Sequence, residues 1–197
     1  MQGSKIRLSP AESELFCSAE MILTKNSILQ KTTDLLLSVQ EQLCTESPPT
    51  IRHTSPPPKI SKGENYLGLP YVVLDYPRIA KGNDLFFVRS LFWWGNFYSS
   101  TLQLAGKFKK DGAHDLEAAY DVLAVKNYFV GINSNPWVHH FKEDNYTAIC
   151  NLSPKAFAAI LEERTHIKIA AQWPLSEWDL AANNLKDSWR ILTGLVT

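Results

Sequence analysis

Hydrophobic residues recur at helical spacing along the first part of the chain, which predicts an N-terminal helical segment over residues 1–44. Ser9, Pro10 and Glu12 form the capping-box pattern that begins a helix. A break at residues 24–26 is expected to separate a short first helix from a longer second one. The residues that share one helical face are Leu15, Ala19, Ile22, Ile28, Thr32, Leu35, Val39 and Leu43.

Residues 45–65 interrupt this pattern with a proline-rich stretch. Proline lacks a backbone N–H and disfavours helical geometry in the residue before it. We therefore expect an exposed linker here, without a helix or a central strand. The Ser55–Pro58 run favours the polyproline II conformation, which leaves two roles open, a partner-binding segment and a plain spacer.

The middle of the chain is rich in β-branched and aromatic residues, which predicts strands. A turn at Gly95 and Asn96 is expected to divide residues 84–106 into the two arms of a hairpin. Alternate positions of the second arm are polar, so this face is expected to meet solvent or line a cavity. With further strands at 71–76, 128–132 and 145–150, we predict an antiparallel sheet of about four to five strands.

Helices are expected at residues 114–126, from Ser153 through Arg164 or beyond, and from Ser176 to the C-terminus. The last of these carries an apolar seam that must pack on a helix or a sheet. The predicted fold class is therefore α+β, a core domain over 66–197 with helices packed on its sheet and the N-terminal helical pair docked on it. The seam residues are Trp178, Ala182, Leu185, Trp189, Leu192 and Val196.

Charge and composition limit the classes of partner. Lysine plus arginine and aspartate plus glutamate number 20 each, so the net charge is zero, which argues against nucleic acid and does not oppose self-association. Three scattered cysteines, at Cys17, Cys44 and Cys150, are typical of reduced thiols. We find neither a signal-peptide pattern nor an apolar run long enough for a membrane helix, so a cytoplasmic protein is expected.

Candidate catalytic residues are Asp75, His139 and His140, since carboxylates and imidazoles serve as general acids and bases. His139 and His140 could also converge with Asp144 on a divalent metal, although adjacent residues of a strand point to opposite faces. The alternative is structural: Asp75 caps a turn, and one histidine lies in the core. We find no nucleotide-binding loop, nucleophile elbow or zinc-protease motif, and we expect no cofactor.

Candidate ligand-binding residues are two arginines and a set of aromatic residues. Arg89 stands within an aromatic strand and Arg78 follows another, and either could hold an anionic group. The aromatic candidates could equally be core residues, and Arg89 could pair with an aspartate under the sheet. These aromatic residues are Trp93, Trp94, Tyr98 and Trp137.

Four segments resemble a family of small bacterial proteins of unknown function, of the Bacteroidetes type. They are ILTKNSILQK at 22–31, KISKGENYLGLPYVVLDYPR at 59–78, FWWGNF at 92–97 and NPWVHHFKEDNY at 135–146. The resemblance spans most of the chain. It implies a bacterial, cytoplasmic protein and transfers no catalytic residue, cofactor or substrate.

Three functions remain open at this point. The first is a non-catalytic interaction or structural protein, which could form a homo-oligomer or bind another protein through the last-helix seam or a sheet edge. The second is a small-molecule-binding protein with an aromatic pocket and an arginine anchor. The third is an enzyme that uses Asp75, His139 or His140.

Overall fold

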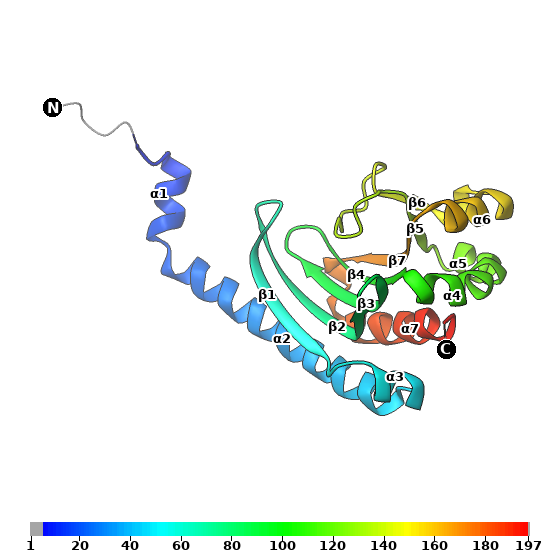
Figure 1. The fold of residues 1–197 in the computed structure, drawn as a ribbon. Helices are drawn as coiled ribbons and strands as arrows, with labels where there is room; N and C mark the ends of the chain where they lie inside the picture. Colours follow the sequence, from blue (N-terminus) through cyan, green and yellow to red (C-terminus); the bar gives the residue numbers. More distant parts are fainter. Residues whose placement is uncertain (1–5, 197) are drawn as a thin grey trace.

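The structure is a computed structural model of the chain, and it describes residues 6–196. Within this range one antiparallel sheet has seven strands in the order β1-β2-β3-β4-β7-β5-β6 (Figure 1). The α+β class and the antiparallel sheet are confirmed, whereas the expected four to five strands fall short because two strands were not foreseen. The strands are β1 (Lys59–Tyr66), β2 (Leu69–Lys81), β3 (Asp84–Trp93), β4 (Phe97–Ala105), β5 (Phe129–Gly131), β6 (Tyr146–Ala148) and β7 (His166–Pro174).

The helices begin largely where capping residues predict them. Ser9 forms the capping box of α1 with Glu12, and the Ser153 hydroxyl caps α6. The break between the first two helices lies at Ser18 instead of at residues 24–26, because the Ser18 hydroxyl accepts from the Met21 N–H and starts α2. The helices are α1 (Pro10–Cys17), α2 (Ala19–Glu46), α3 (Pro49–Thr54), α4 (Gly106–Ala118), α5 (Tyr120–Val125), α6 (Pro154–Glu163) and α7 (Ala181–Gly194), with 3-10 turns η1 (Ile149–Asn151) and η2 (Leu175–Leu180).

The proline-rich stretch 45–65 contains regular structure instead of an extended linker. Pro49 stands in the first turn of α3, where its missing N–H costs nothing, and Ile51 is buried in the core. The strand β1 begins directly after Pro58 and forms an edge of the sheet. Arg78 holds the prolines in place, since its Nε donates to the Pro57 carbonyl at 2.6 Å.

One face of the sheet forms the main core with α2 and α7. Apolar residues from both helices pack against alternate residues of β2, β3, β4 and β7. The Trp189 ring stacks on Tyr76, and its Nε1 donates to the Tyr76 carbonyl at 2.7 Å. Leu185, Trp189 and Leu192 of the apolar seam are thus buried within the domain, whereas Trp178 at its start is only partly buried.

The opposite face of the sheet is partly polar and is covered by residues 132–145 (Figure 1). A small apolar cluster of Val73, Leu91 and Trp93 lies on it. Beside this cluster, polar side chains of β2, β3, β4 and β7 are buried beneath the covering segment. They form the first candidate site.

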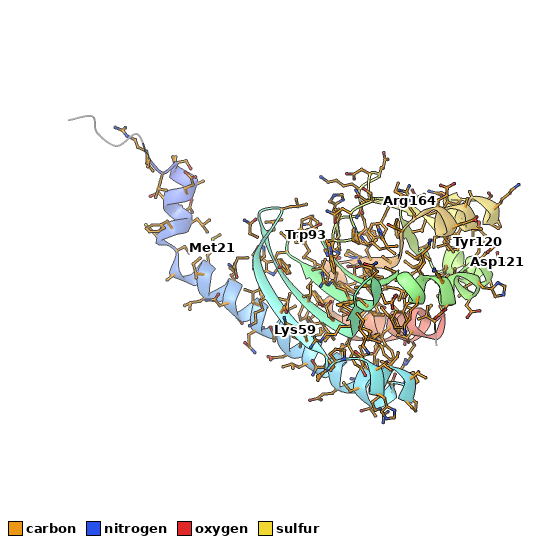
Figure 2. The ribbon with its side chains drawn as sticks, in the orientation of Figure 1. Met21, Lys59, Trp93, Tyr120, Asp121 and Arg164 are labelled. Atoms are coloured by element: carbon orange, nitrogen blue, oxygen red, sulfur yellow. The ribbon has the colours of Figure 1, made fainter. Side chains whose placement is uncertain are left out.

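The N-terminal helices extend beyond the domain. The second half of α2 packs on the core, and its first buried residue is Leu29. The first turns of α2 and all of α1 project past the β1 edge of the sheet, with Met21 near the start of α2 (Figures 1 and 2). We call residues 8–28 the arm; it forms the second candidate site.

Candidate functional site

The first site is a buried polar cluster of Asp75, Arg89, His139 and Lys168. Asp75 and Arg89 are register partners on β2 and β3, so their side chains leave the sheet side by side. Arg89 Nε donates to Asp75 Oδ1 at 2.7 Å and Nη2 donates to Oδ2 at 2.8 Å. This bidentate pair neutralises both charges and satisfies both carboxylate oxygens.

His139 joins the cluster from the covering segment. Arg89 Nη1 lies 3.0 Å from His139 Nε2, and because a guanidinium can only donate, Nε2 accepts and the imidazole proton must be on Nδ1. Burial, followed by the positive charges of Arg89 and Lys168, lowers the pKa of His139 to about 3. The ring is therefore neutral at physiological pH, and its lone pair is already engaged.

Lys168 is the cation that the sequence did not reveal. It lies in the interior strand β7, is 1% exposed and stands opposite Gln103 of β4. Its Nζ donates to the Val138 carbonyl and lies 4.7 Å from the centre of the Tyr146 ring. Burial, and then the nearby Arg89, lowers the pKa of Lys168 to about 8.

The covering segment is fastened to the sheet by several bonds besides that of Lys168. The Tyr66 hydroxyl accepts from the backbone N–H groups of His139 and His140, at 2.8 and 3.2 Å. The fully buried Asn145, itself part of the segment, donates to the carbonyls of Val138 and His140 and so fixes the shape of the segment. Because backbone groups of the segment are paired in this way, it forms a fixed cover over the cluster.

The acid and base groups of the cluster have partners within the protein. Both Asp75 oxygens accept from Arg89, His139 Nε2 lies against Arg89 Nη1, and Lys168 donates to the Val138 carbonyl. Among the described residues, no group of three or more histidine, cysteine, aspartate or glutamate side chains could hold a metal ion. His140 Nδ1 lies 3.8 Å from Asp144 Oδ1, and the described residues supply no third side chain that would complete a metal site with them.

The structure disperses most of the other predicted ligand residues. Trp93 lies near the cluster, where its Nε1 donates to the Tyr66 carbonyl at 3.1 Å. Trp137 is 50% exposed, and its ring centre is 5.9 Å from Arg89 Cζ. Tyr98 is buried on the opposite face, and Trp94 lies at the β3–β4 turn beside α2. Arg78, bonded to Pro57, belongs to neither group.

Sequence reasoning missed Lys168, Tyr66 and Asn145. The alternation in His166–Ala170, where isoleucines separate polar residues, was a strand signal that could have located Lys168 on one face. Tyr66 and Asn145 gave no such signal, because their roles depend on how the covering segment lies across the sheet. The aspartate partner foreseen for Arg89 is present as Asp75.

The arm is the second site, and it is unusually apolar for an exposed helix. In the described part of the chain, no residue of α1 is buried. Phe16 is 81% exposed, and five further large apolar side chains within residues 8–23 are also exposed. They are Leu8, Leu15, Met21, Ile22 and Leu23.

Two apolar hollows lie at the base of the arm and share Trp94. The first, of about 510 Å³, is lined by Leu15, Met21 and Ile22 of the arm together with Trp94. The second, of about 360 Å³, lies between α2 and η2 and includes Ile28 and Trp178. Neither contains Arg89 or Arg78, so the aromatic pocket with an arginine anchor is not formed there.

No helix of residues 6–196 combines the length and the apolar character needed to cross a membrane. Comparison with protein-family models, with curated proteins and with solved structures finds no match to the chain.

Proposed function

We propose that the protein is a non-catalytic interaction protein of the bacterial cytoplasm, whose α+β domain presents the arm to another protein. The bacterial and cytoplasmic assignment rests on the resemblance of the four sequence segments described above. The interaction role rests on a single observation, the contiguous exposure of large apolar side chains on the arm.

Energetics support this interpretation of the arm. Isolated exposed apolar residues are ordinary on protein surfaces, but contiguous ones mark interfaces. Burying one large apolar side chain stabilises a complex by about 1.5–3 kcal/mol, so four or five of them contribute about 6–15 kcal/mol, the same order as the roughly 4–15 kcal/mol entropic cost of association. The helices of the arm are capped at Ser9 and Ser18, which preorganises the surface for a partner.

The polar cluster is consistent with the same function, because its groups serve to hold the covering segment in place. Asp75, Arg89 and His139 bond to one another, and Tyr66, Asn145 and Lys168 fix the segment above them. We assign to the cluster the role of holding residues 132–145 on the sheet. A domain stiffened in this way is a suitable base for a projecting arm.

Photo-crosslinking tests the proposal without assuming the partner. A photoreactive phenylalanine is placed at Phe16 in the full chain and, as a matched control, at Val125, which is 82% exposed and far from the arm. In cells of the source organism we expect one discrete adduct from position 16, identified by its peptides, and none from position 125. Equal labelling at both positions, or none at either, would contradict the proposal.

A further inference from the structure

We infer that the partner of the arm is a second copy of this chain, paired antiparallel about a two-fold axis near Ile22. This inference rests on the proposed function and adds the identity of the partner. Three independent features of the arm support it: the spacing of its apolar residues, the hollows beside it, and the order of its charges.

The apolar spacing of the arm continues a helix interface that the protein already uses. Leu29, Leu36 and Leu43 recur every seventh residue of α2 and are buried against the domain. The same step toward the N-terminus reaches Ile22, which is half exposed. Leu15, also half exposed, lies on α1 beyond the break at Ser18. The apolar surface that packs on the core therefore extends beyond it, and its extension stays half exposed beside Trp94 at the open hollow of the arm.

The hollows supply that surface in the opposite copy. Antiparallel pairing of the two α2 helices about Ile22 directs α1 of each copy, beyond its break at Ser18, toward the Ile28 end of the other copy's arm. Ile28 lines the hollow of about 360 Å³ between α2 and η2. The most exposed aromatic residue of α1, Phe16, thus meets an apolar depression lined by Phe92, Trp94 and Trp178 of the second copy.

The order of acidic and basic residues along the arm favours pairing with a second copy and determines the direction of that pairing. Residues 10–24 carry Glu12, Glu14 and Glu20 and no lysine or arginine, whereas residues 21–33 carry Lys25 and Lys31 and no aspartate or glutamate. Parallel self-pairing would place like charges together, which is unfavourable. Antiparallel pairing about Ile22 brings each acidic stretch to a basic one.

Charged side chains flank this contact on both copies. Lys25 is also bonded to Glu64 of β1 at 2.5 Å, so it bridges the arm to its own domain. Lys31 is exposed and available. The three glutamates make the arm a poor ligand for an anionic membrane surface, which attracts basic segments instead. The zero net charge of the chain leaves no general repulsion between copies.

The test begins with sedimentation of the purified full chain over a concentration series. We expect a reversible dimer of the 22.3 kDa chain. Phe16→Asp should weaken dimerisation by on the order of a hundredfold, as loss of a buried aromatic anchor does. Val125→Asp, the matched control, should leave it unchanged. A chain that is monomeric throughout, or a dimer insensitive to Phe16→Asp, would overturn the inference.

Charge exchange tests the direction of pairing. Glu14→Lys alone and Lys31→Glu alone should each weaken the dimer, and the double variant should restore it, because each copy then supplies both partners of the reversed pair. Additive weakening in the double variant would contradict antiparallel pairing about Ile22.

Disulfide crosslinking tests the position of the axis in a Cys150→Ser background. With Cys17→Ser and Ile22→Cys added, oxidation should join the two copies at position 22. Native Cys17 should not form this link, since it lies on α1 beyond the break at Ser18, and antiparallel pairing about Ile22 places the two Cys17 residues on opposite sides of the axis. A Cys17 link that forms readily would instead indicate parallel pairing and overturn the inference.

The two proposals fail differently. A monomer whose position 16 crosslinks to a different protein keeps the interaction function and overturns self-pairing. A monomer that gives no adduct overturns both. Binding of the purified chain to anionic vesicles through the arm, without dimerisation, would also overturn the inference.

Discussion

Lys168 is predicted to destabilise the folded protein at neutral pH. Its ammonium is buried, and the one carboxylate of the polar cluster, Asp75, is already paired with Arg89. Lys168→Met removes the charge while keeping an unbranched side chain that fills the same space. The Val138 carbonyl keeps a donor in this variant, because Asn145 Nδ2 also bonds to it at 3.2 Å. The variant therefore leaves no new unpaired group there.

The size of the effect follows from the pKa of Lys168. Burial lowers this pKa from 10.5 to about 8, a difference worth about 3 kcal/mol. Because the unfolded chain holds the proton more tightly, the cost is fully present below pH 8 and disappears as the pH rises from 8 toward 10.5. The free energy of unfolding of the wild type should therefore rise over this window relative to that of Lys168→Met.

Urea unfolding followed by tryptophan fluorescence measures this difference. At pH 7 we expect Lys168→Met to be more stable than the wild type by about 1–3 kcal/mol, and the two to converge toward pH 10. Lys126→Met, at an exposed lysine, is the control and should follow the wild type at every pH. Parallel profiles for the wild type and Lys168→Met would refute the reasoning.

Three further changes probe the same site. Arg89→Met should lower the free energy of unfolding by about 2–4 kcal/mol, because it leaves the buried Asp75 carboxylate unpaired; a smaller loss when Asp75→Asn is added would support this cause, and an equal or larger one would contradict it. His139 should remain neutral at pH 5 by NMR, and its low pKa should make stability fall as the pH drops from 6.5 toward 3; a folded-state titration near 6.5 would disprove this. Gly131→Ala should cost about 1–3 kcal/mol by urea unfolding, since a Cβ there would lie 2.8 Å from Lys168 Cβ; unchanged stability would show that the contact relaxes freely.

Local chemistry accounts for the parts of the fold that the sequence predicts well. The Ser9 and Ser153 caps begin helices because each hydroxyl replaces a missing backbone acceptor. Gly95 has a positive φ of 67°, which a turn between β3 and β4 requires and glycine adopts without strain. Such signals involve residues only a few positions apart, so they can be recognised without knowing the tertiary structure.

The two unforeseen strands show where local signals fail. The edge strand β1 follows three prolines, and its pairing with β2 outweighs the turn character of its neighbours. The strand β7 follows α6 after only a short connection, so its alternation was assigned to the end of that helix. Its place between β4 and β5 depends on a crossover that spans β5, β6 and α6.

The polar cluster could be predicted only in part for the same reason. Alternation assigns Arg89 and Trp93 to one face of the hairpin, and the structure places both side chains on that face. The pairing of Arg89 with Asp75 depends on the β2–β3 register, and its contact with His139 depends on the fold of residues 132–145. Lys168 joins the cluster because the strand order places β7 beside β4, which the local sequence does not indicate. Long-range geometry therefore decided what the candidate residues do.

Hydrogen exchange of the full chain at low and high protein concentration tests the central claim most directly. If the arm is an interaction surface for a second copy, amides of residues 10–28 should exchange fast in dilute protein and become protected as concentration rises. Amides of β3, β4 and β7 should be equally protected under both conditions. Arm amides that exchange at the same fast rate at every concentration would contradict self-pairing through the arm.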